Sequence, residues 1–397
     1  MSNIDSSDVL TKTQFIMPIT PRPSLCFTHG KGHYLFDQEG RAYLDMVQGW
    51  AVNALGHCPE VIQKVLNQQS ATLINPGPAF YNAPMLNLAE TLCENSVFDQ
   101  AFFASSGAEA NEGAIKLARK WGQKHKQGAF KIITFKQGFH GRTLATMSAT
   151  GKAAFDPLFE PKVSGFSKVE FNNLNAVEAA IDTQTTAIML ELVQGEAGVI
   201  PADKSFAEGV AALCRKHNLL LIVDEVQTGI GRCGTLFAYT QYGIDPDILT
   251  LGKGLGGGVP ISALLTKHSV SCFDYGDQGG TFNGNPLMCA VAEKVVSEVL
   301  SCGFLQQSQA SGAYLKDALL GVSDQFSLGE VRGTGLLLAM DTQAISATSI
   351  YSGCLERGLI LNAPNTKTLR FVPALNITPV EIDQAIEILG DTLCSLR

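Results

Sequence analysis

The chain has 397 residues, of which 45% are hydrophobic and 17% are charged. This balance excludes an intrinsically disordered protein and a coiled coil. The formal net charge of -8 has the wrong sign for a protein that binds the phosphate backbone of nucleic acids. No run approaches the roughly 20 apolar residues of a membrane span, and the first residues lack a signal-peptide pattern. We therefore expect a cytoplasmic protein whose partners include neither nucleic acid nor a membrane.

The ten cysteines are scattered and form no Cys-x-x-Cys pair. In a long acidic chain such thiols are expected to be reduced residues of the interior or the surface. His29 and His33 stand four residues apart, but two glycines between them indicate a turn rather than a shared helix face. The sequence therefore predicts no metal site.

The first predicted element is a β-hairpin, because apolar and aromatic residues alternate on both sides of a turn signal in GHYLFDQEGRAYLDM. From about residue 85, helices such as EANEGAIKLARKWGQKH alternate with apolar runs such as KIITF, TAIMLELV and LLLIVDEV. Continuous apolar strands between helices are typical of a parallel sheet covered on both faces. The predicted fold class is α/β.

After Leu300 the sequence predicts amphipathic helices, two strands (GLLLAMD and TLRFVPAL) and a closing helix from Pro379. This pattern indicates a smaller α+β domain, completed by the N-terminal hairpin. The predicted division assigns residues 1–60 to the N-terminal segment of the small domain. Residues 61–295 form the large domain, and residues 296–397 form the C-terminal part of the small domain.

Four segments carry residues suited to chemistry, and the first is FFASSGAEANEGAIK. Here a strand is followed by Ser105, Ser106, Gly107 and Ala108 and then by a long helix. Hydroxyls and free backbone N–H groups at a helix N-terminus favour a phosphate group. The alternative is a simple serine cap of the helix.

The second segment is FKQGFHGRT, in which Phe139 and His140 precede Arg142. An aromatic ring can stack on a planar ligand, and a guanidinium can hold a carboxylate through two hydrogen bonds. Each of these residues, taken singly, also has an ordinary structural explanation.

The third and fourth segments each end an apolar strand in a charged residue. In LLLIVDEVQTGIGR the strand ends in Asp224, and in DILTLGKGLGGG it leads to Lys253. Ligands of open parallel sheets bind beyond the carboxyl ends of the strands. A partly desolvated lysine there has a lowered pKa and can form an imine. The alternatives are an aspartate that caps the next helix and a solvated lysine in a flexible loop.

The glycines of the fourth segment also imitate a dinucleotide-binding pattern. Gly252, Gly254 and Gly257 match G-x-G-x-x-G after a strand, and Asp274 follows at a suitable spacing. Pro260 stands where the phosphate-binding helix would run, which argues against a dehydrogenase.

Together the segments resemble the class III, or ω-amino acid, aminotransferases that use pyridoxal phosphate. Within this class the resemblance is strongest to the acetylornithine aminotransferases. It covers nearly the whole chain, in order, through GHYLFDQEGRAYLD, AVNALGH, SSGAEANEGAIKLAR, GFHGRT, QGEAGV, IVDEVQTGIGR, TLGKGLGGGVPI, GTFNGNP, VRGTGLLL and LRFVPAL. It implies fold type I of the pyridoxal-phosphate enzymes and pyridoxal 5'-phosphate as the cofactor.

The resemblance also implies a role for each matching residue. Lys253 would hold the cofactor through an imine and Asp224 would pair with its pyridine nitrogen, and these two are the predicted catalytic residues. Thr281 would reach the phosphate from the neighbouring subunit, which makes the protein a homodimer with shared active sites. The complete predicted cofactor-binding set is Ser106, Gly107, Ala108, Phe139, His140, Asp224, Val226, Gln227, Lys253 and Thr281.

For the substrates, the resemblance implies that Arg142 holds the distal carboxylate and Arg370 the carboxylate beside the reacting carbon. Glu196 would pair with Arg370 when a substrate lacks that second carboxylate. The expected reaction moves the ω-amino group of N-acetylornithine, or a similar donor, to 2-oxoglutarate and gives a semialdehyde and glutamate, as in arginine biosynthesis. Trp50 and Tyr81 are further predicted substrate contacts, and both depart from the usual acetylornithine pattern.

Several alternatives stay open at this point. Within the same class they are ornithine, succinylornithine, 4-aminobutyrate and other diamine aminotransferases, and then an aminomutase or a decarboxylase. A cofactor-bearing regulatory protein without turnover is a further alternative, although binding alone would not need the imine lysine Lys253. The Glu196 and Arg370 pair favours a transaminase that accepts two kinds of substrate.

Overall fold

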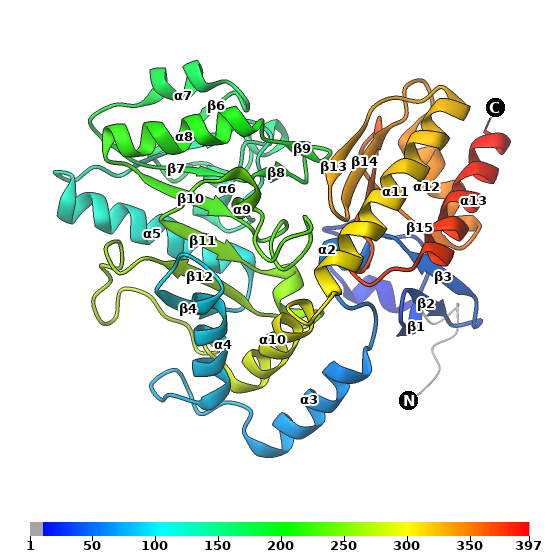
Figure 1. The fold of residues 1–397 in the computed structure, drawn as a ribbon, viewed down its shortest axis with the longest axis horizontal. Helices are drawn as coiled ribbons and strands as arrows, with labels where there is room; N and C mark the ends of the chain where they lie inside the picture. The colour runs from blue at the N-terminus through cyan, green and yellow to red at the C-terminus, as the bar shows by residue number, and fades with distance from the viewer. Residues whose placement is uncertain (1–10, 397) are drawn as a thin grey trace.

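The computed structural model describes residues 11–396 and contains a large sheet with a smaller part beside it (Figure 1). The large sheet has seven strands in the order β4-β12-β11-β10-β7-β5-β6. Their bounds are β4 Gln100–Ala104, β12 Ser262–Thr266, β11 Ile248–Leu251, β10 Leu220–Asp224, β7 Thr185–Leu190, β5 Lys131–Phe135 and β6 Phe166–Val169. The strands from β11 to β6 are parallel, whereas β12 is antiparallel to β11 and β4. The predicted α/β class with a mostly parallel sheet is confirmed.

Alternate residues of β10 face opposite sides of the sheet, as the two-residue period of a strand requires. Leu220 and Ile222 belong to a buried cluster with helix α5 (Gly107–His125). Leu221 and Val223 belong to the larger cluster, which contains residues of helix α8 (Lys204–His217). Because both faces are covered, the strand is apolar throughout until Asp224, which lies on the α5 side.

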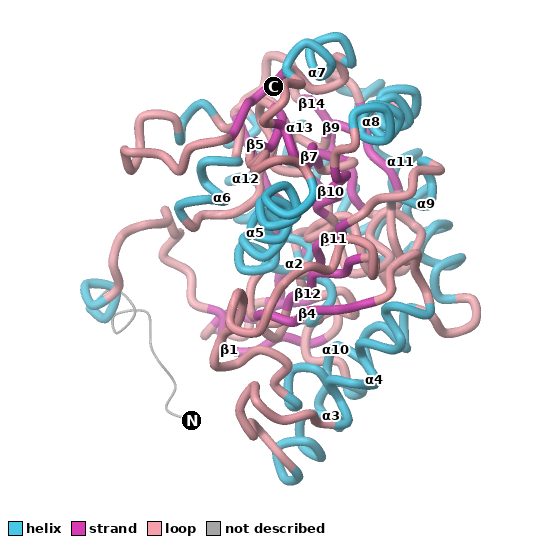
Figure 2. Tube along the Cα trace, turned by 90° about the vertical axis from the view of Figure 1, so that its left-hand side faces the viewer, coloured by secondary structure: helices cyan, strands magenta, loops and turns pink. Residues whose placement is uncertain are grey.

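Helices flank the sheet on both sides, and Figure 2 shows α5 in front of the strands. The remaining elements of this part are α3 Glu60–Thr72, α4 Ala83–Glu94, α6 Leu144–Ala149, η2 Ala153–Phe155, α7 Leu174–Ala180, β8 Val193–Gln194, β9 Ile200–Pro201, α9 Tyr239–Tyr242, η3 Lys253–Gly256 and α10 Pro286–Val299. Helix α10 packs against α3, α4 and η3. These contacts bring the helices that precede the large sheet in the sequence against the helix that follows it.

The smaller part combines both ends of the described chain. One four-stranded sheet has the order β1-β2-β3-β15 and another has the order β13-β14-β17-β16. The elements are η1 Thr13–Phe15, β1 Phe27–Lys31, β2 Tyr34–Asp37, β3 Ala42–Asp45, α2 Gln48–Ala51, α11 Phe304–Phe326, β13 Val331–Thr334, β14 Leu337–Asp341, α12 Ala347–Glu356, β15 Leu359–Ile360, β16 Asn362–Asn365, β17 Thr368–Phe371 and α13 Pro379–Ser395. The hairpin β2–β3 and the strands β14 and β17 confirm three sequence predictions.

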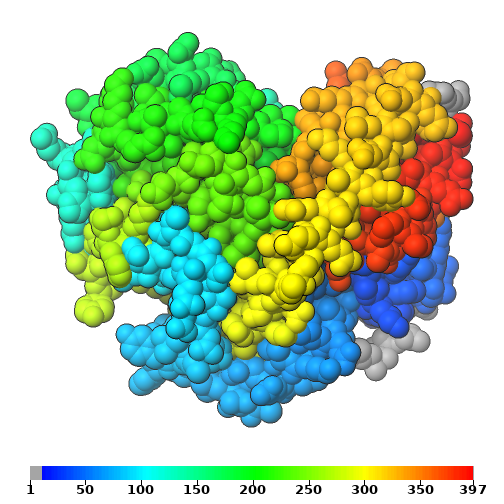
Figure 3. Space-filling model, viewed as in Figure 1, coloured from blue at the N-terminus to red at the C-terminus, as the bar shows by residue number. Residues whose placement is uncertain are grey.

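The space-filling view shows a notch between the green surface that includes α8 and the orange C-terminal part (Figure 3). Of the predicted domain boundaries, the first falls at the start of α3 and the second falls inside α10. The division at these residues therefore stays a prediction. No helix within residues 11–396 is long and apolar enough to span a membrane.

Candidate active site

Asp224 lies at the carboxyl end of β10 and is 4% exposed. Its Oδ2 accepts hydrogen bonds from Asn111 Nδ2 and from His140 Nδ1, each at 2.8 Å. Its Oδ1 accepts one from the backbone N–H of Val226 at 3.0 Å. Because three donors from three segments converge on it, the carboxylate is held in one orientation.

Asn111 connects the neighbours of this carboxylate. Its Nδ2 also donates to the carbonyl of His140 at 2.8 Å, and its Oδ1 accepts from Thr250 Oγ1 of β11 at 2.7 Å. Burial by itself lowers the pKa of His140, but the hydrogen bond to Asp224 and the charge of that carboxylate outweigh burial and raise it. The imidazole is thereby favoured as a cation beside Asp224.

Lys253 begins the helical turn η3 and is separated from the end of β11 by Gly252 alone. Its φ of 42° lies in the left-handed region, which is uncommon for a residue with a side chain. Burial lowers the pKa of Lys253 from 10.5 to about 8. The amine is therefore more often neutral near pH 8 than an exposed lysine, as a nucleophile must be.

The start of helix α5 is formed by small residues, Ser106, Gly107 and Ala108. Ser106 caps the helix: its Oγ accepts from Glu109 N, while Glu109 Oε2 accepts from the backbone of Ser105 and from Ser106 Oγ. A Cβ added at Gly107 would lie 2.6 Å from Val226 Cγ1, so only glycine fits there. The backbone of this first turn is consequently open to an anion, which the helix N-terminus favours.

A cavity of about 270 Å³ joins these groups. It is lined by Gly107, Ala108, Asn111, Phe139, His140, Gly141, Arg142, Glu191, Glu196, Asp224, Val226, Gln227 and Lys253. The structure thus gathers most of the predicted positions around one cavity. Their individual roles stay predictions.

Glu196 and Arg370 meet at one side of this cavity. Glu196 Oε1 lies 2.9 Å from Arg370 Nη2, and Glu196 Oε2 lies 2.9 Å from Lys152 Nζ. Burial raises the pKa of Glu196, but the charges of Arg370 and Lys152 outweigh burial and lower it to about 2. Glu196 is therefore an anion between two cations.

Arg142 lines the same cavity and is exposed. Its guanidinium lies 5.7 Å from the ring centre of Phe155, and that ring meets Phe139 edge to face at 6.5 Å. A guanidinium stacked on an aromatic ring keeps its N–H groups free at the edge. Arg142 can therefore bind a carboxylate that enters from solvent.

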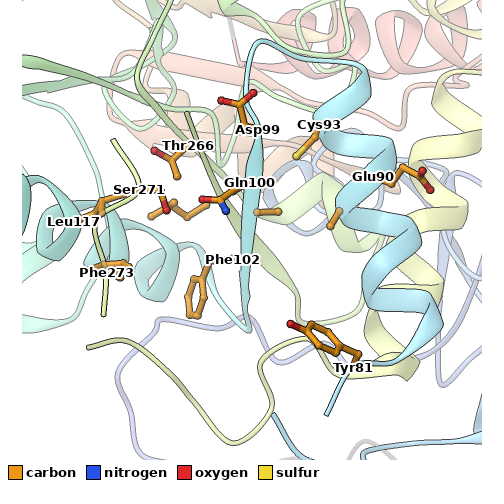
Figure 4. Close-up of a pocket in the computed structure, with 13 residues that line it drawn as sticks. Tyr81, Glu90, Cys93, Asp99, Gln100, Phe102, Leu117, Thr266, Ser271 and Phe273 are labelled. Atoms are coloured by element: carbon orange, nitrogen blue, oxygen red, sulfur yellow. The ribbon is translucent and has the colours of Figure 1, made fainter. Parts of the chain in front are cut away.

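Five predicted residues are not among those that line this cavity: Ser106, Arg370, Tyr81, Thr281 and Trp50. Tyr81 is 84% exposed and lines a separate pocket with residues of α4 and β4, where Figure 4 shows its ring below Phe102. Thr281 is exposed in the loop before α10. Trp50 is 51% exposed on α2. The side chains of Tyr81, Thr281 and Trp50 do not line the cavity around Lys253, although α2, which carries Trp50, packs against the turn η3 that begins at Lys253.

Trp50 stands on an unusual backbone. Gln48, Gly49, Trp50 and Ala51 have φ values of 48°, 62°, 63° and 65°, so this one turn is left-handed. The N–H of Ala51 donates to the carbonyl of Val47, and the turn begins where Asp45 Oδ1 accepts the N–H of Val47 and of Gln48. Left-handed turns of L-residues cost about 1–2 kcal/mol per residue. Such strain is concentrated at functional sites.

Sequence reasoning missed Asn111, Glu191 and Lys152. Asn111 lies one helical turn after Gly107, so its helix position was a usable signal. Glu191 directly follows the end of β7, beside the end of β10 at Asp224, and its Oε1 accepts the N–H of Phe139 at 2.7 Å. Burial raises the pKa of Glu191 to about 7. Lys152 gave no signal, because a loop places it.

The dinucleotide pattern has no matching structure. After Gly252 the chain makes the short turn η3 and then enters the antiparallel strand β12, so no long helix follows the glycines. The part of the chain that the structure describes also contains no group of three or more His, Cys, Asp or Glu side chains that could hold a metal ion.

A lysine, a buried aspartate and an open helix N-terminus at the carboxyl edge of a mostly parallel α/β sheet define an enzyme site for an anionic cofactor. The sequence pattern of the family Aminotransferase class-III matches residues 18–393. The chain therefore belongs to the class-III aminotransferases.

Two relatives share most of this sequence. The acetylornithine aminotransferase of Ralstonia nicotianae is 56% identical over 387 residues, which are 96% of this chain and 97% of that protein. Acetylornithine aminotransferase 2 of Bordetella pertussis is 51% identical over 389 residues, with 97% and 98% covered.

Solved structures share the fold over the whole chain. The ornithine aminotransferase of Toxoplasma gondii has a TM-score of 0.94 at 30% identity and covers 98% of this chain and 95% of its own. The N-acetylornithine aminotransferase of Stenotrophomonas maltophilia has a TM-score of 0.84 at 33% identity, with 97% and 98% covered.

Proposed function

We propose that this chain is a pyridoxal-phosphate-dependent aminotransferase that moves the δ-amino group of N-acetylornithine to 2-oxoglutarate. The products are glutamate and N-acetylglutamate semialdehyde, a step that serves arginine biosynthesis. The observation that carries the proposal is the ion pair of Glu196 and Arg370 beside Lys253. A substrate carboxylate can replace Glu196 at Arg370, and Glu196 can return when the substrate has no such carboxylate. The two relatives named as acetylornithine aminotransferases support the choice of donor.

The residues fit pyridoxal phosphate. The open backbone at Ser106, Gly107 and Ala108 suits its phosphate, and the buried carboxylate of Asp224 suits a protonated pyridine nitrogen. We assign Phe139 and Val226 to the two faces of the ring. Gln227 would bond the phenolic oxygen, and His140 would hold Asp224 in place. When bound, the cofactor supplies an electron sink for the carbon that loses a proton.

Lys253 has two tasks in this proposal. Its Nζ binds the cofactor between turnovers, which requires a neutral amine. When a substrate amine takes its place, the same Nζ would be free to accept the proton that the substrate carbon loses. The lowered pKa of Lys253 suits both tasks, because it lies closer to neutral pH than that of an ordinary lysine.

The two arginines divide the substrate carboxylates. We assign Arg142 to the carboxylate far from the reacting carbon, which both substrates possess. Arg370 would bind the carboxylate beside the reacting carbon of glutamate or 2-oxoglutarate. An ω-amino donor has no such carboxylate, and Glu196 then keeps the buried Arg370 neutralised. Leaving that guanidinium unpaired would be costly.

A second candidate donor is ornithine, and succinylornithine, 4-aminobutyrate and other diamines are further ones. Ornithine is favoured by the structural similarity to the Toxoplasma gondii enzyme. We assign the choice among these donors to Trp50 and the loop that carries Tyr81.

The deciding experiment is a panel of these donors, each with 2-oxoglutarate, in which glutamate formation is followed. N-acetylornithine should give the highest kcat/KM, and Lys253→Ala should give no glutamate with any donor. A higher kcat/KM for ornithine or 4-aminobutyrate would replace the proposed donor. A Lys253→Ala protein that still turns over would place the imine lysine elsewhere.

We further propose a cytoplasmic homodimer in which Thr281 contributes to the partner's phosphate site. The exposure of Trp50, Tyr81 and Thr281 supports this, because all three are predicted site residues that one chain leaves in solvent. Light scattering at low micromolar concentration should give about twice the chain mass of 42.4 kDa. A fully active monomer would refute the shared site.

A further inference from the structure

The carboxylate of Glu196 is divided between two cations. One oxygen lies 2.9 Å from Arg370 Nη2 and the other lies 2.9 Å from Lys152 Nζ. The side chain of Arg370 is 1% exposed, whereas that of Lys152 is 28% exposed. Arg370 already has a role as a carboxylate site, but nothing described so far accounts for Lys152.

The two cations differ in how firmly they are held. Arg370 donates from Nε to Asn362 Oδ1 at 3.0 Å and from Nη1 to the carbonyl of Gly195 at 2.9 Å. It is therefore fixed in position without Glu196. The ammonium of Lys152 is at the end of a flexible stem, with Glu196 as its carboxylate partner and the ring centre of Phe139 5.2 Å away. Lys152 can follow a moving carboxylate, and Arg370 cannot.

The backbone that carries Lys152 is tightly placed. The preceding Gly151 donates its N–H to the carbonyl of Gly138 at 2.9 Å and accepts from the N–H of Gln137 at 2.8 Å. A Cβ at Gly151 would lie 2.1 Å from the carbonyl oxygen of Phe135. The stem of Lys152 thus begins at a fixed point beside the loop that holds Phe139.

We propose that Lys152 is a positioning residue that holds Glu196 when Arg370 is taken by a substrate carboxylate. Lys152 thereby sets how readily the site accepts glutamate and 2-oxoglutarate relative to an ω-amino donor. This inference rests on the proposed function, since it needs a substrate whose carboxylate displaces Glu196 from Arg370.

The expected effect of removing Lys152 follows from the charges around Glu196 in two states, one with an ω-amino donor bound and one with a substrate carboxylate on Arg370. Without Lys152, Glu196 still has Arg370 as a partner while an ω-amino donor is bound. When a carboxylate occupies Arg370, the same Glu196 is left without its cation beside a second anion. Removing Lys152 therefore costs more in the second state than in the first. The pair is partly exposed, so solvent reduces this difference.

The test compares Lys152→Met with wild-type holoenzyme. Lys152→Met keeps the length of the stem and removes the charge. Calorimetry measures the Kd of glutarate, an unreactive dicarboxylate, and of valerate, which has one carboxylate. We expect Lys152→Met to weaken glutarate binding by roughly three- to tenfold and to leave valerate binding unchanged. Lys152→Arg should restore glutarate binding, and KM for 2-oxoglutarate should rise in parallel while KM for the donor does not.

The matched control is Lys216→Met. Lys216 pairs with Glu178 at 2.8 Å, neither residue lines the cavity, and both side chains are exposed. The variant Lys216→Met should leave the Kd of glutarate and the Kd of valerate unchanged. An equal loss of glutarate binding in this control would show that the effect at Lys152 is a general effect of charge, and would overturn the inference.

A second background separates positioning from direct binding. In Glu196→Gln there is no anion to hold, so adding Lys152→Met should not change the Kd of glutarate further. A further loss of the same size would mean that Lys152 touches the ligand itself, and would overturn the inference. If wild-type holoenzyme binds glutarate no more tightly than valerate, the proposed function fails and the inference with it. If wild type discriminates and Lys152→Met behaves like wild type, the inference alone fails.

Discussion

Glu196 and Arg370 form an ion pair of 2.9 Å between a loop after β8 and the last strand of the described fold, β17. The guanidinium is 1% exposed. A buried charge without a partner costs several kcal/mol, so Arg370 needs either Glu196 or a substrate carboxylate beside its guanidinium. The pair therefore has different consequences for the two half reactions.

The first prediction concerns Arg370→Ala. The second-order rate constant of the 2-oxoglutarate half reaction should fall by about 100-fold, because a buried charge-assisted contact to a carboxylate is lost. The ω-amine half reaction should fall by less than about tenfold, since it makes no such contact. Single-turnover spectra of each half reaction measure the two constants. Circular dichroism checks that the variant is folded, and equal losses in both halves would contradict the assignment.

The second prediction concerns Glu196→Gln, which should act in the opposite direction. Without the anion, Arg370 stays free for carboxylates, so glutamate improves as a donor relative to N-acetylornithine. The ratio of their rate constants should shift toward glutamate by about tenfold. The same single-turnover measurement applies. An unchanged ratio would show that Glu196 does not cover Arg370 during turnover.

The third prediction is a pH profile for adding pyridoxal phosphate to apoenzyme. Burial lowers the pKa of Lys253 to about 8, so about half of its amine is neutral at pH 8, and the fraction rises as pH rises. The rate of imine formation, followed by absorbance, should therefore have a midpoint near 8. An N-acetyl-lysine amide in solution serves as the control for an ordinary lysine. If the two profiles coincide, the amine is not desolvated in apoenzyme.

Particular residues show how much the sequence could predict. Asp224 and Lys253 were predictable because an apolar strand that ends in a charged residue places it at the sheet edge. The antiparallel direction of β12 could not be predicted, because a run of apolar residues looks alike in a parallel and in an antiparallel strand. Lys152 was not predictable either, because its contact depends on how a loop folds. The contact of Asn111 with Asp224 becomes evident only from the structure, in which helix α5 packs on the side of β10 that carries Asp224.

The left-handed turn α2 was also invisible in the sequence, because only one of its four residues is a glycine. Side chains at Trp50 and Ala51 do not favour positive φ. Neighbouring contacts must therefore hold this backbone, and among them are the hydrogen bonds to Asp45 Oδ1. That carboxylate is itself anchored, since His57 Nε2 lies 2.9 Å from its Oδ2.

The last prediction uses this turn. At Gly49 an added Cβ would meet its nearest atom, Val52 Cβ, at 3.5 Å, which is an ordinary contact, but its φ of 62° disfavours any side chain. Gly49→Ala should therefore lower the free energy of unfolding by about 1 kcal/mol.

Gly321→Ala is the matched control: Gly321 lies within α11, and an added Cβ there meets nothing within 4 Å. It should raise that free energy by about 0.5–1 kcal/mol, because alanine is the better helix residue. Urea unfolding of both variants measures the two changes, and a rise in the free energy of unfolding of Gly49→Ala would show that position 49 does not require the left-handed backbone.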